Sequence, residues 1–207
     1  MARYIGPVCH LCRRCSEKLM LKGARCYTQK CAMERRKRPT GRRFRRRRVS
    51  DRGLQLVEKQ KARYTYGMLE KQFHRFFIAA EHQSGVTGDN LVVLLERRLD
   101  NVVYRLGFAD SRSQARQIVL HGHIVLSGRR TNIPSCMVKE GDTIGWREAS
   151  TKNEYYKQVT EEIAGKAVPS WLSLDRQNLV GQVLSMPTPE DAGIKFEGQS
   201  IVEYYSR

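Results

Sequence analysis

The chain has 207 residues, of which 40% are hydrophobic, so it can bury the core of one domain or two small ones. No window approaches the roughly 18 uninterrupted apolar residues of a membrane span, and MARYIGPVCH has no apolar run after its charges, so we expect an intracellular protein without membrane association. The net charge is +17, from 38 Lys and Arg against 21 Asp and Glu. This excess predicts a polyanionic partner, most simply nucleic acid.

Five of the six cysteines lie in one stretch near the start of the chain, CHLCRRCSEKLMLKGARCYTQKC. In a reducing compartment, clustered cysteines are more often metal ligands than disulfides. The pairs Cys9/Cys12 and Cys26/Cys31, with 13 residues between them, have the spacing of a structural zinc site with four thiolate ligands. A redox pair is disfavoured because the cysteines lie in a basic loop region and not between a strand and a helix. The spacing therefore predicts one zinc ion, whose binding would stabilise this short segment.

Cys15 is surplus to a four-ligand site. It forms a second C-x2-C pair with Cys12, and the run C-x2-C-x2-C resembles part of a ferredoxin sequence. Three alternatives stay open for Cys15: it replaces Cys9 as a ligand, it remains a free thiol, or it helps to bind an iron–sulfur cluster in place of zinc.

The positive charge is concentrated in the first third of the chain. Residues 1–63 contain 21 basic and 4 acidic residues, whereas residues 64–207 contain 17 of each. Arginine dominates RRKRPTGRRFRRRR, the basic arm (residues 35–48), and its planar guanidinium binds phosphate and stacks on bases. We expect the arm to order on RNA, the alternative being a solvated tail without a ligand. Its candidate RNA-binding residues are Arg35, Arg36, Arg42, Arg43, Arg45, Arg46, Arg47 and Arg48.

The middle of the chain shows a helical period. Ser50 is an N-cap candidate, and Ser111 with Gln114 forms a capping box. SGVTGDN (residues 84–90) is predicted to be a loop. The predicted helices are 51–66, 69–82, 91–106 as one long helix or two abutting ones, and 112–121.

The pattern then changes to that of strands. HIVLSGRRTNI (residues 123–133) predicts a strand, a Ser-Gly turn and a second strand. Further strands are predicted within 141–148, 171–175 and 179–186, with a helix at 153–165 between them. Periodicity leaves 199–206 open between helix and strand. The expected fold class is α+β: a helical domain with an N-terminal zinc-binding segment and basic arm, plus helices packed on an antiparallel sheet.

A second group of basic residues predicts an RNA-binding face in this α+β part. Arg112 and Arg116 are one helical turn apart and should project from the same side, so that they can lie along phosphates of a helical RNA. The alternative is an ordinary solvated helix face. The full candidate set is Arg112, Arg116, His121, His123, Arg129 and Arg130.

An enzymatic function is disfavoured. GVTGDN lacks the Lys and Ser or Thr of a phosphate-binding loop, and no paired carboxylates or nucleophile motif stand out. His74 and His82 are isolated on a predicted helix. A small-molecule substrate is therefore not expected.

Several segments resemble the bacterial-type small-subunit ribosomal protein four (S-four) family, in its zinc-motif form. They are RYIGPVCHLCRR, KGARCYTQKCAMERR, EKQKARYTYG, LERRLDNVVYRLGFADSRSQARQIVLHGHI, PSWLSLD and EYYSR. The longest is typical of the S-four RNA-binding domain, which other RNA-handling proteins share. Resemblance at both ends of the chain singles out the ribosomal family.

The resemblance implies an organisation and a function. The zinc module and basic arm would occupy 1–48, helical domain one 49–90 with the C-terminal segment 195–207, and domain two 91–194, with the S-four domain at about 97–157. The last segment would be a helix returning to the helical domain. Family members bind the 5′ domain of small-subunit ribosomal RNA, nucleate assembly of the subunit body and affect decoding accuracy.

The resemblance also implies partners and a location. Small-subunit ribosomal protein five is the expected protein partner, with protein twelve as a further candidate, in a cytoplasmic or plastid ribosome. Zinc-containing members use the cysteine pattern found at Cys9, Cys12, Cys26 and Cys31. The alternative function is a regulatory RNA-binding protein with an S-four domain outside the ribosome.

Overall fold

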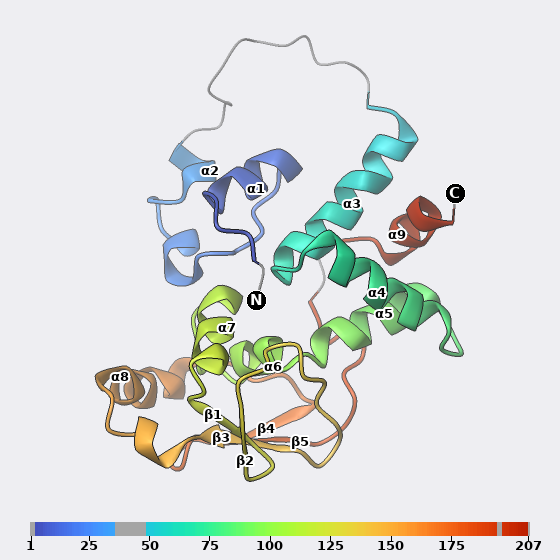
Figure 1. Cartoon of the computed structure of the whole chain (residues 1–207). Coiled ribbons are helices and arrows are strands. Elements are labelled where there is room, and N and C mark those ends of the chain that lie inside the picture. Colours follow the sequence, from blue (N-terminus) through green and yellow to red (C-terminus); the bar gives the residue numbers. More distant parts are fainter. Residues whose placement is uncertain (1–2, 36–48, 194–195, 207) are drawn as a thin grey trace. The chain divides into compact units, whose positions relative to one another are not determined.

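The computed structural model describes residues 3–35, 49–193 and 196–206 (Figure 1). The chain divides into two compact units, Met1–Leu91 with Ile194–Arg207 and Val92–Gly193. We refer to them as unit 1 and unit 2. The boundaries lie beside the predicted ones at 90/91 and 194/195. The cysteine segment is grouped with the helices that follow it, whereas the family resemblance implied a separate module of residues 1–48.

Unit 1 is helical in its described residues. The Ser50 side chain accepts a hydrogen bond from the Gly53 N–H at 3.3 Å, which confirms the predicted N-cap. On α4, Phe73, Phe77 and Ala80 form the buried face that the helical period predicted. The elements are α1 (Cys9–Cys15), the 3-10 helix η1 (Gly23–Tyr27), α2 (Ala32–Arg35), α3 (Asp51–Thr65), α4 (Glu70–Glu81), the start of α5 (Thr87–Glu96) and α9 (Gly198–Tyr205).

The C-terminal segment is a helix, α9, as the family resemblance implied. It packs against α3 within unit 1. The Tyr205 ring lies 4.5 Å from that of Phe77, and its hydroxyl donates to Glu70 Oε1 at 2.8 Å. Gln55 of α3 donates to Glu203 Oε2 at 2.7 Å. The chain end thereby contributes apolar and polar contacts to the unit that contains its beginning.

The predicted loop at 84–90 is wrong from residue 87 onward, because α5 begins at Thr87. The two glycines of SGVTGDN suggested a turn, but Gly88 serves a close helix contact. A Cβ on Gly88 would lie 3.2 Å from the backbone of Gly198 in α9. The Asn90 side chain donates to the backbone oxygens of Ala80, Gln83 and Ser84 at 3.1–3.3 Å, which satisfies carbonyls at the end of α4.

Unit 2 places helices on a five-stranded antiparallel sheet of order β2-β1-β3-β5-β4 (Figure 1). Leu106 at the end of α6 covers Gly181 of β5 so closely that a Cβ there would lie 2.5 Å from its methyl carbons. The remaining elements are α6 (Leu99–Arg105), α7 (Arg112–Leu120), β1 (Ile124–Leu126), β2 (Arg129–Thr131), β3 (Thr143–Trp146), η2 (Glu148–Ser150), α8 (Glu154–Glu162), η3 (Ile163–Gly165), β4 (Leu172–Asp175) and β5 (Val180–Val183). The α+β prediction of helices on an antiparallel sheet is confirmed.

One detail of unit 2 settles a question that the sequence left open, and another confirms a prediction. Residues 91–106 form two abutting helices, α5 and α6, because Arg98 adopts an extended backbone at the N-cap of α6. The predicted Ser-Gly turn joins β1 to β2, with φ of 46° at Ser127 and 79° at Gly128, as a tight hairpin turn requires. In the ranges that the structure describes, no helix is both long and apolar enough to cross a membrane.

Candidate nucleic-acid interface and cysteine cluster

The N-terminal cysteines form a largely buried cluster within unit 1. Four of them are each 7% exposed, and Cys9 at the start of α1 is half-buried. Cys12 and Cys15 pack with Tyr64 of α3 in a small apolar core. We call the five residues the cysteine cluster: Cys9, Cys12, Cys15, Cys26 and Cys31.

Cys12 lies near the other three predicted zinc ligands. Burial raises the pKa of its thiol, and the charges of Cys26, Cys9 and Cys31 raise it further, so all three lie within electrostatic range. The cysteine pairs from the two ends of the segment are therefore brought to one place by the fold.

Cys15 has different surroundings. Burial raises the pKa of its thiol to about 11, and the next strongest influence is the Lys61 ammonium of α3, followed by Cys12, Glu17 and Arg14. Cys15 thus lies near both Cys12 and the Lys61 ammonium of α3. Cys12 packs with Tyr64 of the same helix, so both cysteines lie beside α3.

Backbone amides donate to two of the four predicted ligands. The Lys22 N–H lies 3.3 Å from Cys26 Sγ, and the Leu19 amide donates to the Cys12 sulfur. Such bonds stabilise the thiolate and orient it. The four cysteine sulfurs are therefore ligands of the type that structural zinc sites use. In 3–35, 49–193 and 196–206, however, no three His, Cys, Asp or Glu side chains are arranged to hold a metal ion, so zinc binding stays a prediction.

Most of the basic arm lies outside the described residues. Arg35, at the end of α2, is exposed. The other candidate arginines of the arm, Arg36, Arg42, Arg43, Arg45, Arg46, Arg47 and Arg48, are not among the residues that the structure describes.

Arg116 does not lie on an exposed face, in contrast to the sequence prediction. Its residue is only 7% exposed, and its guanidinium bonds the Asp100 carboxylate at 2.8 Å. Arg98, fully buried, bonds the same carboxylate at 2.7 and 3.1 Å. Helical spacing placed Arg112 and Arg116 on one side of α7 but could not show that this side faces α6. We call Arg98, Asp100 and Arg116 the buried ion-pair cluster.

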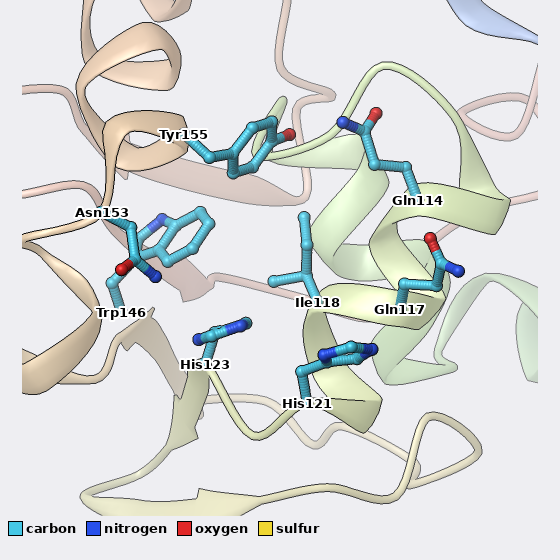
Figure 2. Close-up of a pocket in the computed structure, with 8 residues that line it drawn as sticks. All are labelled: Gln114, Gln117, Ile118, His121, His123, Trp146, Asn153 and Tyr155. Carbon is cyan, nitrogen blue, oxygen red and sulfur yellow. The ribbon is translucent and has the colours of Figure 1, made fainter.

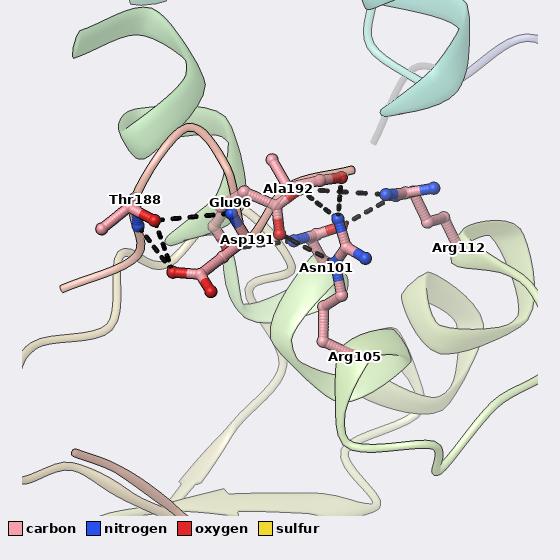
Figure 3. A network of polar contacts seen from close by, with 7 residues as sticks. All are labelled: Glu96, Asn101, Arg105, Arg112, Thr188, Asp191 and Ala192. Atoms are coloured by element: carbon pink, nitrogen blue, oxygen red, sulfur yellow. Dashed lines mark hydrogen bonds and ion pairs between the residues drawn. The ribbon is translucent and has the colours of Figure 1, made fainter. Parts of the chain in front are cut away.

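Arg112 belongs to a second polar network, around Glu96 (Figure 3). Its Nε donates to Asn101 Oδ1 at 2.7 Å, and its guanidinium lies 4.6 Å from the centre of the Tyr104 ring. The fully buried Glu96 accepts two bonds from Arg105 at 2.9 Å. These contacts hold the Arg112 side chain against α6, so its guanidinium is only partly available to a ligand.

The remaining candidates lie at the end of α7 and in the β1–β2 hairpin, and they face solvent. His121, Arg129 and Arg130 are exposed, and His123 is half-buried. The Arg130 guanidinium lies directly over Gly122, where a Cβ would approach its Nε to 2.6 Å. This part of the predicted face is available to a ligand.

Sequence reasoning missed one cation of this region. Arg147, just after β3, is exposed and acts on His123 together with His121 and Arg130. Burial lowers the pKa of His123, and these three neighbours lower it further. The register that pairs Ile124 with Trp146 brings Arg147 beside His123, whose backbone oxygen accepts from the Arg147 N–H at 2.8 Å. We call His121, His123, Arg130 and Arg147 the cationic rim, and Arg130 and Arg147 carry its fixed positive charge.

The fold and the exposed cations define a class: a strongly basic α+β protein that presents exposed cations on its second unit. Comparison with protein families agrees with that class. Residues 3–96 match the ribosomal protein S4/S9 N-terminal domain, and residues 97–144 match the S4 domain.

Full-length relatives identify the particular family. The chain is 55% identical to the small ribosomal subunit protein uS4 of Dehalococcoides mccartyi and 55% identical to that of Halothermothrix orenii, with 100% of both chains covered in each case. It is 53% identical to the uS4 of Trichlorobacter lovleyi over the same span. The chain therefore belongs to the ribosomal protein S4 (uS4) family.

Proposed function

We propose that this chain is a structural, non-enzymatic constituent of the small ribosomal subunit that binds ribosomal RNA. The observation that carries the proposal is similarity over the whole length to relatives named small ribosomal subunit protein uS4. Residues 1–63 contain 21 basic and only 4 acidic residues, and this positive charge supports an RNA partner, because Lys and Arg displace the counterions of phosphates.

The RNA target in this proposal is the 5′ domain of small-subunit ribosomal RNA. Binding there would nucleate assembly of the subunit body and contribute to translational accuracy. The protein partner would be small-subunit ribosomal protein five, with protein twelve as a second candidate. These finer assignments rest on the family resemblance, and the proposed location is the cytoplasmic ribosome.

Recognition would combine charge with shape. The basic arm would contact the phosphate backbone, and the cationic rim with Arg129 would lie along a helical groove, where imidazoles donate to phosphate or 2′-hydroxyl groups. The exposed positions of Arg129 and Arg130 support this arrangement. Arg116 would contribute indirectly, by fixing α7.

A zinc ion bound by Cys9, Cys12, Cys26 and Cys31 is part of the proposal. The grouping of these thiols around Cys12 and the amide bonds to Cys12 and Cys26 support it. When bound, zinc would supply structural stability and no reaction chemistry. An iron–sulfur cluster is the alternative.

Sedimentation tests the ribosomal role. The tagged full chain, expressed in a bacterium that depends on it, is expected to sediment in one-to-one proportion with small subunits on a sucrose gradient. A chain found only in the soluble fraction would favour the alternative of a regulatory RNA-binding protein outside the ribosome. Filter binding to a 5′-domain transcript then tests the RNA target separately.

Elemental analysis of purified protein tests the metal. We expect about one zinc per chain. Cys12→Ser should lose that zinc, whereas Cys15→Ser, the matched control, should retain it. Zinc-free protein with intact thiols would refute the site. Iron with inorganic sulfide would favour the cluster, and loss of zinc from Cys15→Ser would make Cys15 a ligand.

A further inference from the structure

A pocket of about 260 Å³ opens on unit 2 between α7, the start of β1, the end of β3 and the start of α8 (Figure 2). It is smaller than the roughly 300–1,000 Å³ of sites for drug-sized ligands, so it suits one small planar group. Its lining combines aromatic, amide and imidazole side chains. The lining residues are Gln114, Gln117, Ile118, His121, His123, Trp146, Asn153 and Tyr155.

Aromatic packing fixes one wall of the pocket. The Trp146 ring lies 5.7 Å from that of Phe108, 6.1 Å from Tyr155 and 5.6 Å from Tyr156. The Tyr155 hydroxyl donates to the Phe108 carbonyl at 2.9 Å, and burial raises its pKa to about 12, so it stays neutral. The wall is therefore rigid and uncharged before any ligand arrives, which lowers the entropy cost of stacking on it.

One buried donor of this wall is unsatisfied. Trp146 Nε1 has no hydrogen-bond partner among the described residues, although it is shielded from solvent. A buried N–H without an acceptor is unfavourable, and most such groups find a partner. Because this N–H is shielded even from water, a ligand in the pocket would stack on the ring of Trp146 and would not bond this atom.

Amides line much of the rest of the pocket. Gln114 and Gln117 lie on the α7 side and Asn153 on the α8 side (Figure 2). The Gln114 oxygen already accepts from the Asp110 N–H at 3.1 Å, so that side chain has its amino group to offer. Amides supply both donors and acceptors, as the mixed hydrogen-bonding edge of a nucleobase requires.

Charge is distributed unevenly around the pocket. The cationic rim lies at one end, where His121, Arg130 and Arg147 all act on His123. At the Tyr155 end, the carboxylates of Asp110 and Glu162 are the charges that act on the ring. A phosphate would therefore bind at the histidine end, which gives a bound nucleotide one orientation.

We propose that this pocket holds one unstacked nucleotide of the bound RNA, with its base against Trp146 and its phosphate at the cationic rim. The inference rests on the proposed RNA-binding function and adds a subsite to it. Recognition of splayed-out bases by aromatic and amide side chains is the usual way in which proteins read single-stranded positions of RNA.

Tryptophan fluorescence provides a direct test with the full chain and a 5′-domain ribosomal RNA transcript. The chain has two tryptophans, and the other, Trp171, is 1% exposed in the core, so it supplies a constant background. Stacking on Trp146 should quench its emission at a one-to-one ratio of RNA to protein. In the Trp146→Phe variant the RNA-dependent quenching should disappear.

Matched variants give a second readout that does not depend on Trp146. Gln117→Ala, in the pocket wall, should weaken transcript binding about threefold through loss of a hydrogen bond. Gln158→Ala, an exposed glutamine of α8 outside the pocket lining, should bind like the wild type. Trp146→Leu should weaken binding by about fivefold or more, since stacking of a base is lost.

The outcomes separate the two proposals. If the transcript binds without quenching, and Gln117→Ala behaves like Gln158→Ala, the pocket proposal is overturned while RNA binding stands. If the wild-type chain does not bind the transcript at all, the proposed function fails and the nucleotide subsite fails with it. Quenching together with a selective loss in Gln117→Ala supports the subsite.

Discussion

The buried ion-pair cluster and the cationic rim lie in the same unit and both contain arginines, but the environments of these arginines are opposite. Arg116 is 7% exposed and bonds Asp100 at 2.8 Å. Arg130 is exposed and lies over the backbone of Gly122. The basic residues of unit 2 therefore divide into a set that completes the fold and a set that faces solvent.

The physical reason is the cost of desolvation. A guanidinium removed from water is tolerated only if a carboxylate and further hydrogen bonds replace its hydration. Removing an exposed one changes stability little, yet it deletes a charge that can neutralise a phosphate. Mutations in the two sets should therefore separate stability from RNA affinity.

The largest effect is expected at Asp100, the shared carboxylate of the buried ion-pair cluster. Asp100→Ala would leave Arg98 and Arg116 buried without it, and breaking a buried pair in this way costs about 3–5 kcal/mol in the free energy of unfolding. The control is Asp110→Ala. The Asp110 carboxylate is 44% exposed and pairs with Lys166 at 2.9 Å, so its removal should lower the free energy of unfolding by about 1 kcal/mol or less. Urea denaturation followed by circular dichroism measures both. Equal losses would contradict the division.

The sequence predicted the elements of the fold well because local signals determine them. The Ser50 cap, the α4 face of Phe73 and Phe77, and the Ser127-Gly128 turn are all present. The error at 84–90 arose because Gly88 was read as a turn residue. It is in fact a helical glycine that leaves room for the close approach of α9. Such contacts between distant segments cannot be read from periodicity.

The candidate site was less predictable for the same reason. Helical spacing predicted that Arg112 and Arg116 lie on the same side of α7, but it could not predict that α6 covers this side. Arg147 joins the cationic rim only through the pairing of β1 with β3. The pocket around Trp146 combines residues of α7, β3 and α8 with neighbouring cap and loop residues, so no local sequence motif predicts it.

Gly122→Ala tests whether the position of Arg130 matters, apart from its charge. Gly122 has a φ of 71°, so alanine there should cost about 1–2 kcal/mol in the free energy of unfolding. Its Cβ would also displace the Arg130 guanidinium. The matched control is Gly128→Ala, where φ is 79° but no atom lies within 4 Å of the added Cβ.

Both glycine variants should lose similar stability in urea denaturation, because the backbone strain is similar. Only Gly122→Ala should also weaken binding of a 5′-domain transcript in a filter-binding titration. If both variants bind RNA like the wild type, the position of the Arg130 guanidinium over Gly122 has no role in RNA recognition.

Removing the exposed arginines of the β1–β2 hairpin should weaken RNA binding and leave the stability of the fold unchanged. We expect Arg129→Ala with Arg130→Ala to weaken transcript binding about tenfold and to reduce the slope of log affinity against log salt by about 2. The control, Lys139→Ala with Arg176→Ala, removes the same charge at exposed positions elsewhere in unit 2. Filter binding between 50 and 200 mM salt separates local contact from net charge. An equal loss in both double variants would show that only net charge matters.

The smallest effect is expected at Glu70, which is intermediate between the two environments because its side chain is 43% exposed while its partner Lys59 is 5% exposed. Burial alone would raise the pKa of Glu70, but hydrogen bonds from Lys59 and Tyr205 and the charges of Lys59 and Arg63 lower it overall. A carboxylate with a lowered pKa in the folded state stabilises the protein above its unfolded pKa of about 4.3, and that contribution is lost as the pH falls through the folded value.

Glu70→Gln should therefore be less stable than the wild type at pH 7, by less than about 1 kcal/mol because solvent screens the pair. The difference should shrink as the pH falls below about 4, where both side chains are neutral. Glu81→Gln, at the exposed end of the same helix, is the control and should change stability little at either pH. Urea denaturation at pH 7 and pH 3 checks this, and a difference that persists at pH 3 would assign the Glu70 effect to packing and not to charge.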